Sequence, residues 1–284
     1  MQNATLTVVL GQTALPHDLE NLVQTAFDKN LHLNVLILGE TPPIPMFSIG
    51  IGEFNAYSLP NDWQGRVDQA RATLEQQRAK IAAYLAAQGT SAEVRGISGD
   101  VSGLATAVAC VGLTCDMILL GDDLRSNERL FTDVIQATLF KTAAPVMLNC
   151  PASVNALQPR SVFVAWRAGI PATRAIRAAL PLLRRAQEVT VALFDPVSNT
   201  SGDGENPGTD VASWLTHDGC SVTVQQYASG GEEIGIAMLR RRKECGADLV
   251  VMGAYDHSRI RETVLGGTTQ TMIEQRDCPV LLCH

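Results

Sequence analysis

The chain has 284 residues, of which 46% are hydrophobic and 18% charged, a composition that supports a folded core and excludes a disordered protein. Its formal net charge is −7, and its densest basic cluster, at 240–243, is too short to follow a nucleic-acid backbone. We therefore expect no nucleic-acid partner and interpret that cluster as a solvated stretch near a helix end.

The N-terminal residues show no basic flank followed by an apolar run, so no signal peptide is expected. Every apolar run is far shorter than the roughly 20 residues that a membrane helix needs, so we expect no membrane partner. The 7 cysteines are odd in number, and none has the CxxC spacing of a metal or redox motif. This usage disfavours a disulfide framework or a metal site and favours a reducing, cytoplasmic location.

In the first half, short apolar runs alternate with longer amphipathic ones, which is typical of a parallel sheet covered by helices. Strands are predicted at 6–10, 33–38, 93–97, 117–120 and 146–148. Helices are predicted at 16–30, 62–88, 101–113 and 128–142. A Pro- and Gly-bearing loop at 41–60 is long enough to be a lid, an interaction segment or an insertion.

The second half repeats this order of elements. Strands are predicted at 161–166, 188–194, 221–226, 249–252 and 280–283, and helices at 171–185, 209–218, 232–245 and 261–276. The segments 115–121 and 144–150 match 247–253 and 278–284, which indicates a duplicated unit. We predict two domains, 1–150 and 160–284, joined by a polar linker, with a flexible loop at 195–208.

The segment with the clearest chemistry follows the strand that ends at Gly253. A loop with His257 and Arg259 leads to Gly266, Gly267, Thr268 and Thr269. Glycines at a strand end let a backbone approach a phosphate, and the free amides of a helix start attract anions. The cationic side chains and the hydroxyls would suit the same ligand. The carboxyl ends of parallel strands are also where open α/β sheets bind ligands.

This segment resembles the C-terminal signature of universal stress proteins, in which Gly, two residues, Gly, nine residues and Gly-Ser/Thr surround ATP. Gly253 and Gly266 match its first and third glycines. The resemblance covers both halves and implies an α/β fold of two tandem universal-stress-protein-like (adenine nucleotide alpha hydrolase-like) domains. It implies a five-stranded parallel sheet with helices on both faces of each domain. It also implies an intramolecular pseudo-dimer, paired through the last strands, and leaves a further homodimer open.

Two positions of the signature depart from the family pattern. Asp256 replaces its second Gly, and Gly267 replaces its Ser or Thr. A carboxylate beside a triphosphate costs on the order of 1 kcal/mol or more unless a cation intervenes. Thr268, one position on, is the candidate replacement for the missing hydroxyl.

The end of the first strand of the second half also departs from the family. Arg167, after Trp166, stands where the family tends to carry an acidic residue near the nucleoside. An Arg can meet a phosphate or stack, but it cannot accept hydrogen bonds from ribose hydroxyls. For Trp166, packing in the core is favoured over a role in stacking on a base. The candidate nucleotide-binding residues are Trp166, Arg167, Gly253, Asp256, His257, Arg259, Gly266, Gly267, Thr268 and Thr269.

The first half lacks most of the signature. Asp122 and Asp123 follow Gly121. The residues equivalent to Gly266 and Gly267 fall near 131–134, where no glycine occurs. A pair of aspartates at a strand end is typical of a turn or a helix cap rather than of a metal site. We therefore expect a degenerate site without nucleotide in this half.

The leading hypothesis is a stress-response module whose second domain binds ATP or another adenine nucleotide, with or without Mg²⁺. No G-x-G-x-x-G, G-x-S-x-G or H-E-x-x-H motif is present, so no catalytic residue is assigned and any ATP hydrolysis would be slow and incidental. One alternative is a nucleotide-free scaffold for an unknown protein partner. Another is a small-molecule transferase or hydrolase that uses Asp256 and His257.

Overall fold

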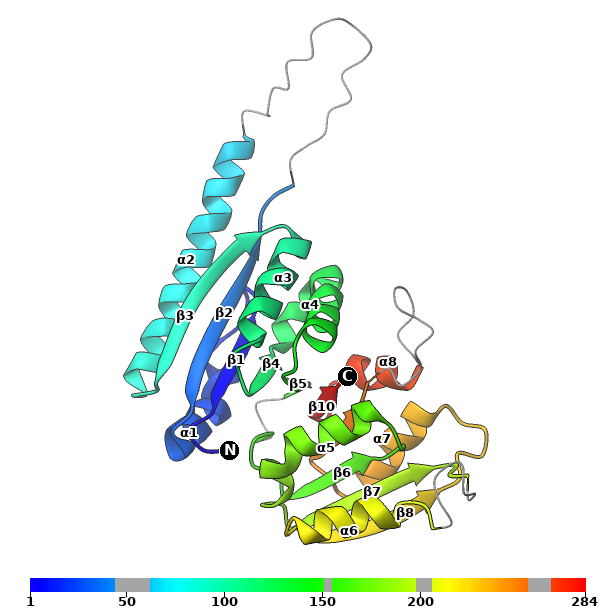
Figure 1. Ribbon diagram of the computed structural model, residues 1–284. Coiled ribbons are helices and arrows are strands. Elements are labelled where there is room, and N and C mark those ends of the chain that lie inside the picture. Colours follow the sequence, from blue (N-terminus) through cyan, green and yellow to red (C-terminus); the bar gives the residue numbers. More distant parts are fainter. Residues whose placement is uncertain (44–61, 151–154, 198–205, 255–266) are drawn as a thin grey trace, which may run out of the picture.

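The structure, a computed structural model, describes residues 1–43, 62–150, 155–197, 206–254 and 267–284 (Figure 1). In these ranges a single sheet has the strand order β3-β2-β1-β4-β5-β10-β9-β6-β7-β8. The first half supplies β1 (Thr5–Leu10), β2 (His32–Glu40), β3 (Ala92–Gly99), β4 (Met117–Leu120) and β5 (Val146–Leu148). The second half supplies β6 (Ser161–Ala165), β7 (Glu188–Phe194), β8 (Val222–Tyr227), β9 (Leu249–Gly253) and β10 (Val280–Cys283).

The helices follow the alternating pattern of the sequence. Those of the first half are α1 (Glu20–Lys29), α2 (Trp63–Ala87), α3 (Val101–Gly112) and α4 (Glu128–Lys141), with 3₁₀ turns η1 (Pro16–Leu19) and η2 (Asp122–Ser126). Those of the second half are α5 (Ile170–Leu183), α6 (Thr209–His217), α7 (Ile234–Glu244) and α8 (Gly267–Glu274). Within the described ranges, no helix is both long and apolar enough to cross a bilayer.

The two halves join through their last strands. All strand pairs within each half are parallel, whereas β5 and β10 pair antiparallel, with Met147 opposite Leu281. The carboxyl ends of the two sets of strands therefore point to different sides of the molecule (Figure 1). The predicted fold of two tandem five-stranded parallel sheets is confirmed, and the junction is the one that the family resemblance implies.

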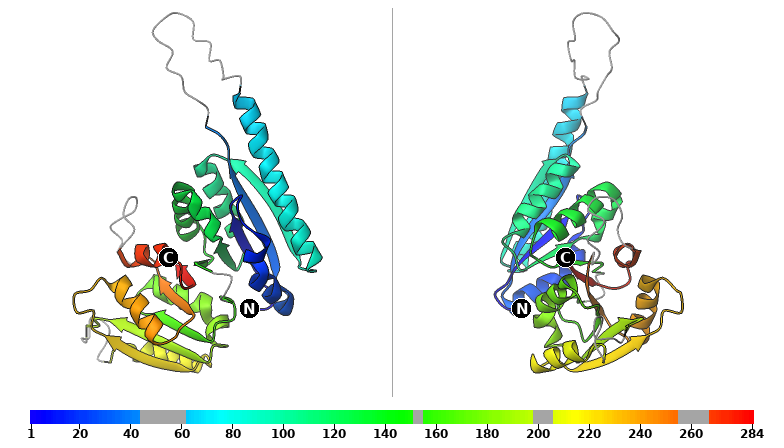
Figure 2. Two further views of the ribbon diagram at one scale, coloured as in Figure 1. Left: turned by 180° about the vertical axis from the view of Figure 1, so that it is seen from behind. Right: turned by 45° about the vertical axis from the view of Figure 1, so that its right-hand side comes forward.

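Each face of the sheet carries its own apolar core. One core packs side chains of α1, α2, α5 and α6 on the sheet, and the other packs those of α3, α4, α7 and α8 (Figure 2). Central strands are buried on both faces; β4, β5 and β10, for example, contain only buried residues. This double burial explains why these strands appear in the sequence as continuous apolar runs instead of alternating ones.

Several boundaries differ from the sequence-based expectation. The helix predicted at 16–30 is divided into η1 and α1. The last residue of α1 is Lys29, because Asn30 adopts a left-handed conformation with a φ of 53°. The strand predicted at 161–166 ends at Ala165, so Trp166 lies beyond it. The described part of the helix predicted at 261–276 begins at Gly267. The Asp122–Asp123 pair forms a 3₁₀ turn, which confirms the turn interpretation.

Candidate functional site at the carboxyl edge of the second half

The candidate site lies where β6, β9 and α8 meet the carboxyl edge of the second half. Parallel pairing of β6 with β9 sets Ala165 opposite Met252, so Trp166 and Arg167 leave the sheet beside Gly253. The structure thus brings together Trp166, Arg167 and Gly253, and it places Gly267, Thr268 and Thr269 in the first turn of α8. The other candidates, Asp256, His257, Arg259 and Gly266, lie outside the described residues.

Gly253 is required by packing at the end of β9. A Cβ on this residue would lie 2.5 Å from the main-chain nitrogen of Ala172 and 2.7 Å from the carbonyl carbon of Pro171. Because both are backbone atoms of α5, the start of that helix would have to move. The sequence analysis predicted that this glycine lets the backbone approach a phosphate closely. In the structure, the group that approaches Gly253 closely is the backbone at the start of α5.

The residues after β6 divide between core and surface. The main-chain amide of Trp166 donates to the carbonyl of Ala192 at 2.9 Å, and its ring packs against the apolar core on the α5 face. Arg167 is exposed. On α5, Arg174 donates to the carbonyl of His284 at 2.7 Å. Two guanidinium groups therefore lie on elements that border this edge, where they would attract an anionic ligand.

Glu233 ties the beginnings of α7 and α8 together. Its carboxylate caps α7 by accepting from the amides of Gly235 at 2.9 Å and Ile236 at 3.0 Å. It also accepts from the hydroxyls of Thr268, at 3.4 Å, and Thr271, at 3.2 Å, in α8. In this structure Thr268 therefore binds a carboxylate oxygen. The first turn of α8 already receives an anionic oxygen, the kind of group that helix starts favour.

Thr269 does not share this environment. It is buried, with 5% of its surface exposed, so its hydroxyl is not presented to solvent at the edge. Sequence reasoning named Thr269 for its hydroxyl and did not name Glu233. Glu233 is the N-terminal cap of α7. Its contact with α8 joins residues 35 apart in the chain, a separation that no local pattern reveals.

At the carboxyl edge of the first half, a carboxylate fills the corresponding space. Asp123 accepts from the amide of Gly11 at 3.1 Å and from the hydroxyl of Thr13 at 3.4 Å. A Cβ on either Gly11 or Gly121 would lie 2.8 Å from an oxygen of this carboxylate. Burial raises the pKa of Asp123 above its ordinary value, and the backbone hydrogen bonds oppose that rise. The amides that could hold an anion here already bind a side chain of the protein.

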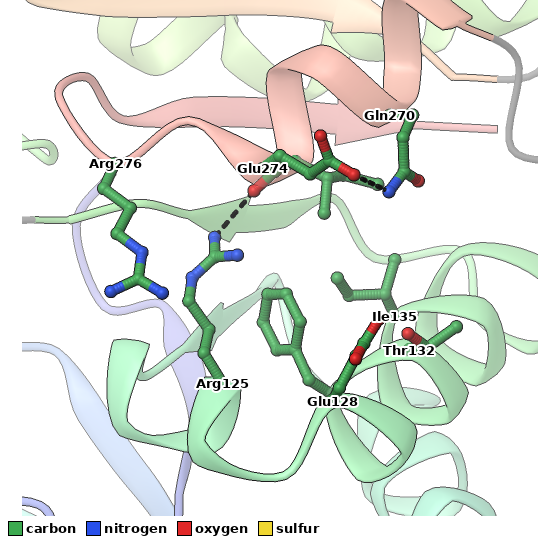
Figure 3. Close-up of a pocket in the computed structure, with 9 residues that line it drawn as sticks. Arg125, Glu128, Thr132, Ile135, Gln270, Glu274 and Arg276 are labelled. Atoms are coloured by element: carbon green, nitrogen blue, oxygen red, sulfur yellow. Dashed lines mark hydrogen bonds between the residues drawn. The ribbon is translucent and has the colours of Figure 1, made fainter.

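A hollow of 260 Å³ lies between α4 and α8, at the junction of the halves (Figure 3). Arg125 enters it with only 9% of its side chain exposed and donates to the carbonyl of Ile273 at 2.7 Å. Its guanidinium also pairs with Asp122 at 3.3 Å and lies 4.2 Å from the ring centroid of Phe131. Arg276 and two glutamates complete a wall of mixed charge. We interpret this hollow as part of the junction between the halves.

Comparisons with known proteins agree with this fold. The model of the universal stress protein family matches residues 162–284. The curated universal stress protein Slr1230 of Synechocystis sp. (strain ATCC 27184 / PCC 6803 / Kazusa) is 36% identical over 63 residues, which are 22% of this chain and 21% of that relative. The match thus spans about a fifth of the relative's length.

Two solved structures resemble the whole chain. A universal stress protein from Archaeoglobus fulgidus DSM 4304 has a TM-score of 0.66 at 17% identity, over 98% of this chain and 97% of that one. A putative universal stress protein from Pseudomonas aeruginosa UCBPP-PA14 has a TM-score of 0.57 at 14% identity, over 99% and 92%. At these identities the likeness concerns the fold.

Proposed function

From the match of residues 162–284 to the model of the universal stress protein family, we propose that the second half of the chain binds an adenine nucleotide. The ligand is ATP or a related nucleotide, with or without Mg²⁺. The site is the carboxyl edge formed by the ends of β6 and β9 and the start of α8. The phosphates lie toward α8 and the exposed Arg167.

The observation that carries this proposal is the carboxylate of Glu233 at the start of α8. Thr268 and Thr271 both donate hydroxyl groups to it. Phosphate oxygens accept the same hydrogen bonds and gain from the same helix end. The nucleotide therefore competes with Glu233 for the first turn of α8, which would weaken binding without abolishing it.

The first half contributes no nucleotide site in this proposal. The carboxylate of Asp123 lies between Gly11 and Gly121 and takes the amide that a phosphate would use. Asp122 stands beside it on the same 3₁₀ turn. A phosphate at this edge would meet two carboxylates and lose hydrogen-bond donors, so the expected stoichiometry is one nucleotide per chain.

The test is calorimetric titration of the full chain with ATP and Mg²⁺, for the wild type and Glu233→Gln. The substitution keeps one oxygen, which can accept from the amide of Gly235 or Ile236, and it removes the charge that repels phosphate. We expect about three- to tenfold tighter binding, which corresponds to about 0.7–1.4 kcal/mol. Asp256→Gly, which restores the family glycine, should act in the same direction.

Glu232→Gln is the matched control. Glu232 precedes Glu233, and its carboxylate pairs with Arg240 at 2.8 Å on α7. Removing its charge should leave the affinity for ATP within about twofold of the wild type. If both substitutions increased the affinity for ATP equally, the increase would come from the change in net charge. That result would count against a site at α8. No binding by the wild type, Glu233→Gln or Asp256→Gly at millimolar ATP would reject the proposal.

The second candidate function is a nucleotide-free scaffold of the same fold that binds a protein partner. The favouring observation is that the hydroxyls of Thr268 and Thr271 already donate to a carboxylate of the protein itself, that of Glu233. Absence of ATP binding in the wild type, Glu233→Gln and Asp256→Gly would favour this function over the first.

We also propose that the protein is not an enzyme and that any ATP hydrolysis is slow and incidental. The contrary hypothesis, a transferase or hydrolase that uses Asp256 and His257, predicts turnover that His257→Ala abolishes. Turnover that is unaffected by His257→Ala would exclude that hypothesis.

A further inference from the structure

A basic hollow of 260 Å³ opens at the junction of the two halves, away from the carboxyl edge described above. Three separate segments line it: the end of α1, the linker that precedes β6, and the turn between α5 and β7. Each segment contributes one cation, namely Lys29, Arg160 and Arg185. No carboxylate occurs among the described residues that line it. The hollow is therefore a local concentration of positive charge on a protein whose net charge is −7.

Lys29, Arg160 and Arg185 differ from several other arginines of the protein because they lack acidic partners. Arg78, Arg95, Arg184 and Arg240, for example, each pair with a nearby carboxylate. In the described part of the chain, no ion pair involves Lys29, Arg160 or Arg185. The carboxylate of Asp248, which follows α7, accepts instead from the main-chain amides of Arg160 and Ser161. It leaves the Arg160 guanidinium without a counter-ion.

The walls of the hollow are fixed relative to one another. The buried hydroxyl of Thr25, on α1, accepts from the side-chain amide of Asn155 in the linker at 2.9 Å. The carbonyl of Arg160 accepts from the amide of Gln187 at 2.7 Å and so ties the linker to the turn before β7. Leu157 and Leu182, both buried, lie beneath the charged groups. The backbone segments that carry the three cations are therefore held together by hydrogen bonds and apolar packing.

A single cation at the end of a helix needs no ligand, since the carbonyls of the last turn favour it. That account covers Lys29, in the last turn of α1. It does not explain why two arginines from other segments converge on the same space, because three like charges repel one another. An anion that lies among them removes this repulsion and receives several charge-assisted hydrogen bonds.

We propose that this hollow binds a small anion with two or more phosphate groups, held by Lys29, Arg160 and Arg185. Guanidinium groups suit phosphate oxygens because their fixed donors can bind two oxygens at once. The side chain of Gln187, which also lines the hollow, carries a further donor, its amide NH₂ group. Because Lys29 belongs to the first half and the arginines to the second, the anion connects the two halves and stabilises their junction.

The test uses inorganic pyrophosphate as the probe, titrated calorimetrically into the full chain at low ionic strength. We expect one site per chain, weaker binding of inorganic phosphate, and a higher Tm in the presence of pyrophosphate. Lys29→Gln and Arg185→Gln should each weaken pyrophosphate binding about tenfold, since each removes one charged donor. Far-UV circular dichroism of each variant checks that the fold is retained.

Arg184→Gln is the matched control, because Arg184 precedes Arg185 but its guanidinium binds the carboxylate and carbonyl of Asp218. It should bind pyrophosphate as the wild type does. Arg167→Gln should do so as well, which separates this hollow from the proposed nucleotide site. Absence of binding, equal affinity in Lys29→Gln and Arg185→Gln, or a loss caused by Arg167→Gln instead would overturn the proposal.

Discussion

The side-chain amide of Asn149 donates a hydrogen bond to the main-chain carbonyl of Met272, 2.9 Å away, across the junction of the two halves. Asn149 is completely buried and follows β5, whereas Met272 lies in α8. The Oδ1 of Asn149 accepts from Arg125, which also donates to the carbonyl of Ile273. One buried amide and one guanidinium of the first half therefore hold the end of the helix whose beginning forms the candidate nucleotide site.

Replacing Asn149 should test this junction. Asn149→Ala should lower the free energy of unfolding by about 2–4 kcal/mol, because it leaves buried polar groups unpaired and sets an alanine in the left-handed region. The φ of Asn149 is 58°. Asn149→Gly loses the same hydrogen bonds without that strain, so its loss should be about 1 kcal/mol smaller. Urea unfolding of both variants measures the difference. Wild-type stability in Asn149→Ala would refute the role assigned to this residue.

Gly253 and Gly267 should respond differently to alanine. In Gly253→Ala the new methyl group would overlap main-chain atoms of α5, so we expect a loss of about 2 kcal/mol or more. In Gly267→Ala the methyl group would meet Glu233 at 3.5 Å, an ordinary contact, and alanine suits a helix better. Its stability should be unchanged or about 0.5–1 kcal/mol higher. Chemical unfolding of the two variants measures their free energies of unfolding. Equal changes in the two variants would contradict the packing role of Gly253.

Asp123 should give the protein a specific dependence on pH. Burial raises the pKa of its carboxyl above the ordinary 3.8, so the folded protein keeps this proton to a higher pH than the unfolded chain does. Its contribution to the free energy of unfolding must therefore fall as the pH rises from about 3.8 through the raised folded value. Asp123→Asn lacks this titration. Urea unfolding across that range should show wild type losing stability relative to the variant as pH increases; the opposite slope would exclude this sign.

The cysteines should react in order of exposure. Cys110 is exposed, whereas burial raises the pKa of Cys278 to about 11 and that of Cys283 to about 12. Because the thiolate is the reactive form, iodoacetamide at pH 8 should label Cys110 in the native protein. It should label the other two only after unfolding in urea. Peptide mass spectrometry measures each site, and labelling of Cys283 as fast as Cys110 would contradict its burial.

Much of the fold could be predicted because it depends on local patterns. The strands at 117–120, 146–148, 188–194 and 280–283 have the predicted bounds, since each is a mostly apolar run bounded by polar or turn residues. The repeat of Asp, apolar strand and Gly indicated two equivalent units. The division of the first helix was not predicted. It depends on Asp18, whose side chain accepts from the amide of Leu15 at 2.8 Å and supports a 3₁₀ turn.

The candidate site was predicted less completely, because its contacts join distant parts of the chain. The glycine pattern located Gly253 and the start of α8 but could not show that α5 covers Gly253. Nor could it show that Glu233 reaches Thr268, or that Asp123 bonds to Gly11, 112 residues away. In both halves a carboxylate lies at the carboxyl edge for reasons of tertiary packing.

Nucleotide binding in the second half is tested most directly by photolabelling the full chain with 8-azido-ATP and Mg²⁺, followed by peptide mapping and competition with unlabelled ATP. We expect the label that unlabelled ATP suppresses to lie in peptides of 160–284, near Arg167 or the segment after Gly253. We expect no such label in 1–150, where the carboxylate of Asp123 occupies the carboxyl edge of the strands. Competed labelling confined to the first half, or no competed labelling at all, would contradict a nucleotide site in the second half.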